Sequence, residues 1–391
     1  MGYYTADSSM FKLIPGLPLA YWISKKTLKV FSSSNTIGSF GKALQGTITG
    51  NNEHFLRYWF EINKKRMALN GERGYKWYPH NKGGNYRKWY GNREYVINWE
   101  NNGRDIRTFV DSKGKLRSRP QNIDSFFIQG ISWSDLTAGK YSTRFYPNGS
   151  TFDATGPTIP FKDATYLNYL LGNMNSVVFQ MLLDISCPGI HYNNGVITKL
   201  PVIIDDNRKA AIDKTVAECI DISRSDWDSF ETSWDFKQHP LVEYRHSVSK
   251  VNAPDSWYLK DAYEAWEYQC NLCFDTLKAN EEELNRIFID IYGLQDELTP
   301  EVEDKDVTVR LADKKRDIRS LISYAVGCMF GRYSLYKEGL FYAGGPWDFG
   351  SKVDLLSDYA KASGVHPWNP SALYLPDRDN VIPICDDEYF D

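Results

Sequence analysis

The 391-residue sequence lacks any apolar run that approaches the roughly 18 residues a membrane-spanning helix requires. It also lacks the pattern of a secretory signal peptide at its start, and Ala6 stands where a myristoylation signal has Ser or Thr. Its six cysteines include a single close pair, too few for a disulfide framework in a chain of this length. These absences predict a protein of the reducing cytoplasm, with no membrane partner.

Motifs of several enzyme classes are missing as well. The histidines do not cluster, and Cys270-Asn-Leu-Cys273 has no second Cys or His pair nearby to complete the four ligands of a structural zinc site. Neither the Gly-x-Ser-x-Gly motif of hydrolases nor a dinucleotide-binding Gly-x-Gly-x-x-Gly is present. The sequence therefore predicts no catalytic residues, no metal and no cofactor site within this chain.

Aromatic residues are abundant, at 15% of the chain, and the charges are unevenly placed. Residues 57–119 hold 16 Lys/Arg against 6 Asp/Glu, whereas residues 275–391 hold 13 against 23, although the net charge is only −4. A basic block inside a mildly acidic chain indicates a surface for a polyanion on one part of the molecule. On charge count alone, a solvated charged face is the alternative.

The first half of the chain has the pattern of short strands. We expect strands at 95–99, 125–129, 131–133 and 141–146, and a hairpin turn at Pro147-Asn148-Gly149. Residues 152–160 are rich in Gly and Pro and would lead to a central helix.

Helical periodicity dominates from residue 170 onward. Apolar positions predict a helix over 170–185, interrupted at Gly172-Asn173, restarted by a cap at Asn175-Ser176 and stopped by Cys187-Pro188-Gly189. Further helices are predicted over 209–222, with Asp205-Asp206 at its N-terminus, and over 259–292 and 316–333. The sequence thus predicts an α+β fold, with a mixed domain over 1–205 and a mainly helical region over 206–391.

Two stretches carry the chemistry of nucleic-acid binding. Thr49, Asn51 and Asn52 lie among small-residue turns that could present backbone donors and short polar side chains to a phosphate, with a plain turn as the alternative. The second stretch, residues 75–93, interleaves cations with aromatic rings, and the alternative for it is a basic aromatic hairpin facing solvent. Its candidate DNA contacts are Lys76, Trp77, Asn81, Lys82, Arg87, Lys88, Trp89 and Arg93.

Several motifs resemble one protein family, the adenine-specific DNA methyltransferases of the type IIG and BREX PglX kind. The most specific is Lys-Trp-Tyr-Pro-x-Asn-Lys-Gly-Gly-x-x-Arg-Lys-Trp-Tyr-Gly-Asn at 76–92, and Gln-Gly-x-x-Thr-Gly-Asn-x-x-x-Phe at 45–55 resembles TaqI-like specificity domains. The segments 14–22, 170–202, 282–294, 326–335 and 342–345 are also similar to parts of PglX-like enzymes.

The resemblance covers only the non-catalytic C-terminal portion of that family. A Phe-x-Gly-x-Gly loop for S-adenosylmethionine and an Asn/Asp-Pro-Pro-Tyr/Phe motif for the flipped adenine are absent, since Asn369-Pro370 is followed by Ser371-Ala372. The resemblance implies that this chain is a fragment that recognises double-stranded DNA for phage defence. The missing methylase domain would use S-adenosylmethionine. Partners would be that domain or other defence-system subunits, and the chain alone should bind DNA weakly and methylate nothing.

Two other classes of protein stay open at this stage. One is a stand-alone DNA specificity subunit of a restriction system. The other is a glycan-binding module, because surfaces rich in Trp and Tyr also stack on sugars, although the basic block argues against it.

Overall fold

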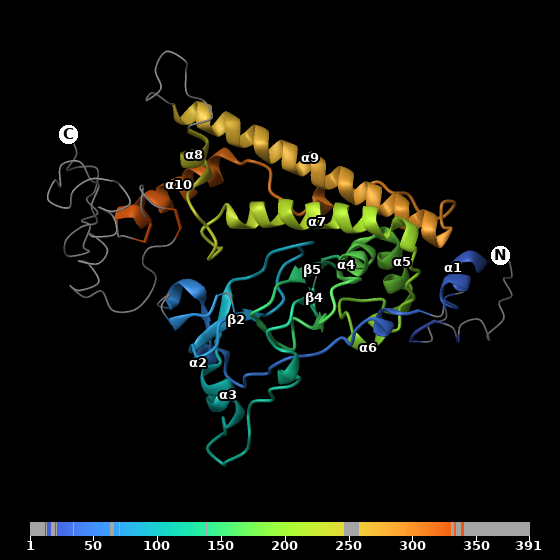
Figure 1. Cartoon of the computed structure of the whole chain (residues 1–391), viewed down its shortest axis with the longest axis horizontal. Coiled ribbons are helices and arrows are strands. Elements are labelled where there is room, and N and C mark those ends of the chain that lie inside the picture. Colours follow the sequence, from blue (N-terminus) through green and yellow to red (C-terminus); the bar gives the residue numbers. More distant parts are fainter. Residues whose placement is uncertain are drawn as a thin grey trace, which may run out of the picture. The chain divides into compact units, whose positions relative to one another are not determined.

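The computed structural model describes residues 12, 14–16, 20, 22–33, 35–62, 66–69, 71–137, 139–245, 258–329, 332–333 and 338–339 (Figure 1). The predicted motif at 342–345 and Asn369-Pro370 lie outside these residues. The chain forms two compact units. Unit 1 comprises residues 1–58, 66–227 and 272–310, and unit 2 comprises residues 59–65, 228–271 and 311–391.

Unit 1 contains two small sheets. The first has the strand order β1-β3-β2-β6, and the second has the order β5-β4-β7. Their strands are β1 (Leu56–Tyr58), β2 (Trp77–Asn81), β3 (Tyr95–Asn98), β4 (Gly130–Trp133), β5 (Thr143–Tyr146), β6 (Thr151–Phe152) and β7 (Thr158–Pro160). All pairings are antiparallel except that of β2 with β6, where His80 faces Thr151.

The strand predictions are confirmed in part. β3 and β5 fall within the expected stretches, and β4 begins one residue before the expected 131–133. The stretch 125–129 is no strand, because Ile123–Ser125 forms a 3-10 turn and Phe127 has a φ of +67°. The turn at Pro147–Gly149 does not close a hairpin, because β5 and β6 pair in different sheets. All residues of β2 are buried, so its two faces do not differ in exposure. The sheet partners of such a strand cannot be inferred from the alternation of apolar and polar residues.

The first sheet encloses a small aromatic core. Phe55, Tyr78, Trp99, Phe126 and Phe152 are all buried in it. They belong to or adjoin the short helix α2 (Asn52–Phe55), the strands, helix α3 (Glu100–Arg107) and the 3-10 turn Ile123–Ser125. The loops next to the first sheet project from this core.

A second, larger core surrounds helices α4 (Leu167–Asn175) and α5 (Val177–Ser186). As predicted, Ser176 separates them: its side chain accepts a hydrogen bond from the Phe179 backbone and caps α5, which ends at Ser186 with Cys187 as its C-cap. The predicted interruption at Gly172-Asn173 is wrong, because α4 continues through both residues. Gly172 is needed there for close packing, since a Cβ would lie 2.8 Å from the Val216 side chain.

Two long helices complete this core. Helix α7 (Asp206–Asp228) begins with Asp205 accepting a hydrogen bond from the Asn207 backbone, and helix α9 (Leu259–Tyr292) has the bounds that its periodicity predicted. The two run antiparallel, as Figure 1 shows, with Arg208 pairing with Asp290 at one end. Short helices α1 (Lys25–Val30) and α6 (Asn194–Ile197) belong to the same unit.

Unit 2 is mainly helical in its described part. It contains α8 (Pro240–Glu243), residues 259–271 of α9, and α10 (Lys314–Met329), packed on a cluster of Leu241, Trp266 and Cys270. Cys270 is buried among apolar side chains. In the part of the chain that the structure describes, no helix is both long and apolar enough to cross a bilayer.

The α+β prediction with a helical C-terminal region is confirmed. The contacts divide the chain differently from the expected boundary at residue 205, because α7 and residues 272–310 belong to the unit that contains the sheets. The functional boundary at 205 stays a prediction.

His239 gives unit 2 a predicted sensitivity to acid. Its Nδ1 accepts a hydrogen bond from the Leu241 backbone at 3.2 Å, and its Nε2 lies 2.7 Å from the Ser320 hydroxyl. Burial lowers the pKa of His239 to about 4, although Asp317 opposes the shift. A proton on Nδ1 would face the Leu241 N–H, so the neutral form is the one the fold accommodates.

We therefore expect unit 2 to lose about 2 kcal/mol of stability between pH 7 and pH 5 through His239 alone. The depressed pKa means that the contribution is fully present above the unfolded pKa of 6.5 and is lost as the pH falls toward 4. Urea melts of wild type and His239→Asn at both pH values measure it, with His191→Asn, at an exposed loop position, as the control. If the stability of all three proteins depended equally on pH, the loss could not be assigned to His239.

Candidate nucleic-acid interface

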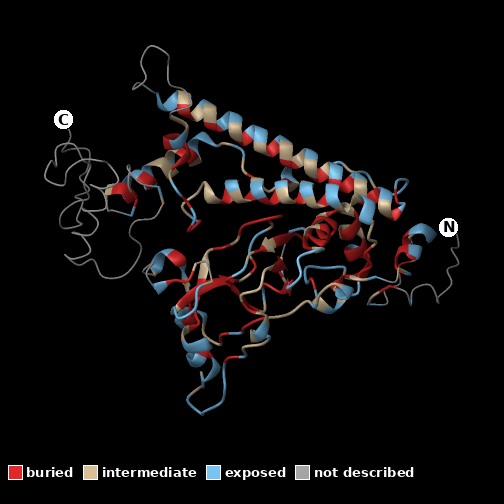
Figure 2. Cartoon of the chain, in the orientation of Figure 1, coloured by how far each residue is buried: buried red, intermediate tan, exposed pale blue. Residues whose placement is uncertain are grey.

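Most of the basic aromatic block at 75–93 is inside unit 1. Its first part forms β2 in the middle of the first sheet, and the following loop packs under α7 and α9. The buried members of the predicted DNA-binding set are Trp77, Asn81, Arg87, Lys88, Trp89 and Arg93. Figure 2 shows this region of the ribbon largely in red.

Lys88 and Trp89 both bind one carboxylate of α9. The Lys88 ammonium lies 2.6 Å from Glu281 Oε2, and the Trp89 indole N–H donates to Glu281 Oε1 at 2.7 Å. Burial by itself lowers the pKa of Lys88, but the charge of Glu281, with that of Tyr86, outweighs it and the pKa is raised. Lys88 is therefore a buried cation neutralised by the protein.

Arg87 is held in the same way by α7. Its guanidinium donates to Asp226 at 2.7 Å and to the Ser223 and Tyr90 carbonyls, and it lies 5.1 Å from the Trp227 ring centroid. Burial raises the pKa of Asp226, but Arg310 and Arg87 outweigh it, so the carboxylate pKa is lowered.

The other buried members also have protein partners. Asn81 donates to Ser132 and to the Gly156 carbonyl, and the Arg93 guanidinium lies 5.4 Å from the Tyr90 ring centroid. From the sequence we expected Asn81, Arg93 and Trp77 on a DNA-facing surface, but all three are buried in the structure. The physical reason is that groups distant in sequence enclose them: Ser132 and the Gly156 carbonyl bind Asn81, as Asp226 and Glu281 bind Arg87 and Lys88.

Five of the predicted residues remain at or near the surface or in a polar loop. Lys76 lies 4.0 Å from Glu100, and Lys82 lies 5.1 Å from the Tyr95 ring centroid, each partly exposed. Asn51 caps α2 by accepting from the His54 backbone. The buried Thr49 hydroxyl donates to the side chain of Asn52, which is exposed. The part of these five residues in DNA binding stays a prediction.

A cationic hairpin at residues 109–119 was not singled out from the sequence. Its two arms pair through the Asp111 N–H on the Lys115 carbonyl at 2.8 Å and the Arg117 N–H on the Phe109 carbonyl at 2.9 Å. Asp111 Oδ1 accepts from the backbones of Lys113 and Lys115 and so fixes the turn. In Figure 1 this hairpin projects below α3, and Figure 2 shows its tip as exposed.

The hairpin carries four cations against the single acid Asp111. Lys113, Lys115, Arg117 and Arg119 are all exposed, and within the described residues none has a carboxylate within 4.0 Å. Nearby residues could have predicted this hairpin, because Asp111 and Gly114 stand at turn positions and are flanked by Val110 and Leu116.

The loop containing Thr49 and Asn51 lies directly against the hairpin. Ile48 and Arg119 exchange two backbone hydrogen bonds of 3.0 and 2.8 Å. A Cβ added to Gly50 would lie 2.8 Å from the Arg117 carbonyl, and Gly50 has a φ of +74°, so glycine is required there. The predicted phosphate-binding loop and the hairpin thus form one surface of unit 1.

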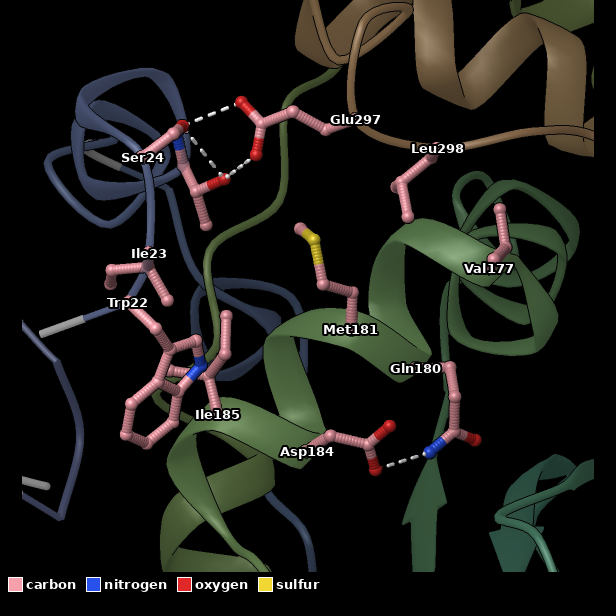
Figure 3. A pocket seen from close by; sticks show the side chains of 11 residues that line it. Trp22, Ile23, Ser24, Val177, Gln180, Met181, Asp184, Ile185, Glu297 and Leu298 are labelled. Carbon is pink, nitrogen blue, oxygen red and sulfur yellow. Dashed lines mark hydrogen bonds between the residues drawn. The ribbon is translucent and has the colours of Figure 1, made fainter. Parts of the chain in front are cut away.

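Unit 1 also has an open apolar groove of about 660 Å³ between residues 22–27 and α5 (Figure 3). Met181 and Ile185 line it, and the Trp22 ring at its rim is 65% exposed. Both carboxylate oxygens of Glu297 accept hydrogen bonds, from Ser24 and Thr27. Among the residues that the structure describes, no three His, Cys, Asp or Glu side chains converge to hold a metal ion.

Comparisons with known proteins identify related sequences. No family model matches the chain. It is 39% identical over 394 residues to the adenine-specific methyltransferase PglX of Lacticaseibacillus casei (strain Zhang), covering 99% of this chain and 31% of that protein. It is 32% identical over 402 residues to the adenine-specific methyltransferase BrxX of Escherichia coli O9:H4 (strain HS), covering 97% of this chain and 30% of that protein. The chain spans about a third of the length of these curated relatives.

Proposed function

We propose that this chain, which is related over nearly its whole length to PglX- and BrxX-type adenine-specific methyltransferases, recognises the DNA target of such an enzyme. The parent activity would be adenine-N6 methylation of DNA in a BREX-type phage-defence system. The likeness covers about a third of each relative, so the remaining two thirds supply ample length for a methylase domain.

The observation that carries the proposal is the exposed cationic surface of unit 1. Residues 104–119 hold six Lys/Arg against two acids, whereas the buried Arg87 and Lys88 of the same unit pair with Asp226 and Glu281. Exposed cations supply the sequence-independent attraction to phosphates, and side chains on the same surface can contact base edges. Double-stranded DNA is therefore the partner we propose.

Binding of S-adenosylmethionine is assigned to the parts of the enzyme outside this chain. The sequence has neither of the two motifs that the family resemblance leads one to expect for the cofactor and the flipped adenine.

A hybrid enzyme tests the proposal. The matching third of the Lacticaseibacillus PglX is replaced by this chain, and the methylated adenines in DNA from cells expressing the hybrid are mapped. We expect the hybrid to modify adenines in a sequence context different from that of the parent enzyme, because this portion would set the target.

The control is the parent enzyme expressed at the same level, and the isolated chain is assayed for DNA binding in parallel. An active hybrid that keeps the parent's target would refute a recognition role. An inactive hybrid, combined with no salt-dependent binding of duplex DNA by the isolated chain, would count equally against it.

A further inference from the structure

The hairpin at 109–119 is a short two-stranded antiparallel ribbon. Two backbone hydrogen bonds join its arms and form a single antiparallel bridge between Val110 and Leu116. The major groove of B-DNA is about 12 Å wide and admits a ribbon of this kind, whereas the minor groove is about half as wide. The shape of the hairpin therefore matches one groove of duplex DNA better than the other.

We propose that this hairpin enters the major groove, with its cations on the flanking phosphates and Leu116 against the base edges. The inference rests on the target-recognition function proposed above and names the element that performs it. It differs from the expectation drawn from the sequence, which gave this task to residues 75–93.

Exposed apolar side chains at the centre of the cationic tip support the proposal. Val110 is 47% and Leu116 is 50% exposed, on neighbouring positions of the two arms. Lys115 and Arg117 flank Leu116 along the chain, and Lys113 lies in the turn. Thymine presents a methyl group in the major groove, and apolar side chains are its usual contacts. The tip thus combines phosphate-binding cations with a patch that suits thymine.

The hairpin is also fixed in position before any ligand arrives. Phe109 packs edge-to-face on Phe55 at 5.2 Å between ring centroids, and the buried Ser118 hydroxyl donates to the Ile106 carbonyl. A preformed recognition element loses less conformational entropy on binding than a loop that must first become ordered. Asn52, two residues after Gly50, has an exposed side chain that can donate to a phosphate.

The test measures binding of a fluorescent 30-base-pair duplex by the full chain across a salt series. The triple variant Lys113→Gln, Lys115→Gln, Arg117→Gln should bind at least about tenfold more weakly at low salt. Its slope of log K against log salt should be shallower by about 2.7, or 0.9 for each lost phosphate contact. The matched control removes three exposed cations of α10 through Lys314→Gln, Lys315→Gln and Arg319→Gln and should keep the wild-type slope.

The variant Leu116→Ser tests the apolar contact with the base edges separately from the phosphate contacts of the cations. We expect binding about tenfold weaker with an unchanged salt slope, because no phosphate contact is lost. Replacing thymine by deoxyuridine throughout the duplex should weaken wild type and leave Leu116→Ser unaffected. Thermal melting of each variant confirms that the fold is retained, as expected for substitutions at an exposed tip.

The outcomes distinguish the two proposals. If wild type binds duplex DNA but the hairpin variant keeps the wild-type slope, the hairpin assignment fails and target recognition stands. If wild type binds no duplex even at low salt, the hairpin assignment fails, and the hybrid enzyme then decides whether target recognition stands. Equal binding of thymine and deoxyuridine duplexes by wild type, or tighter binding of an A-form RNA duplex with its narrow major groove, would also overturn the hairpin assignment.

Discussion

Replacing Glu281 by Gln is expected to lower the free energy of unfolding of unit 1 by about 3–5 kcal/mol. Glu281 is 3% exposed and is the carboxylate on which the Lys88 ammonium and the Trp89 indole converge. Glutamine keeps an acceptor for Trp89 but leaves the Lys88 charge buried without a counterion. Removing one partner of a buried pair is costly because the remaining charge has lost its hydration.

Urea unfolding followed by tryptophan fluorescence measures this effect. Glu283→Gln is the matched control on the same helix, since Glu283 is exposed and pairs with the exposed Arg286; it should change stability by less than about 0.5 kcal/mol. In a double-mutant cycle, Lys88→Met should recover part of the loss caused by Glu281→Gln, with a coupling of about 2 kcal/mol. A Glu281→Gln loss below about 1 kcal/mol would contradict the buried ion pair.

Replacing Gly46 by Ala is expected to destabilise unit 1 by about 3 kcal/mol. A Cβ at this position would lie 1.8 Å from the Phe152 carbonyl oxygen and 2.7 Å from its ring. The next residue, Thr47, donates its N–H to that same carbonyl at 2.9 Å. The two backbone segments would have to separate, so this hydrogen bond and the packing of Phe152 in the aromatic core would both weaken.

Gly139→Ala is the control for this prediction. Gly139 is exposed, and its added Cβ would meet nothing closer than 3.4 Å, so we expect little change in stability. Chemical denaturation of both variants gives the comparison. Equal stability of the two alanine variants would show that the contact at Gly46 relaxes without cost.

The helices could be predicted because their signals are local. The apolar period over 259–292 gave the bounds of α9, and Ser176 marked the start of α5 through its capping hydroxyl. Phe127 shows where such reasoning fails: its φ of +67° is unusual for an aromatic residue and breaks the strand that its neighbours predict.

The positions of the cations could not be predicted, because their partners are distant in sequence. Asp226 lies 139 residues from Arg87, and Glu281 lies 193 residues from Lys88. A stretch such as Arg87-Lys88 has the same composition whether it contacts phosphate or a buried carboxylate. The hairpin could have been predicted from the sequence, because the turn residues Asp111 and Gly114 and the flanking apolar pair lie close together along the chain.

The turn of the hairpin is a site where chain length can change. Gly114 has a φ of +76°, and a Cβ there would meet nothing within 4 Å, so residues added beside it would extend into solvent. Each doubling of a flexible loop costs only about 0.6 kcal/mol, and the arms are anchored at Phe109 and Arg119 independently of the tip. Insertions at Gly114 would therefore lengthen the reach of this arm while the aromatic core beneath it stays intact, which makes it a natural place to graft new binding sequences.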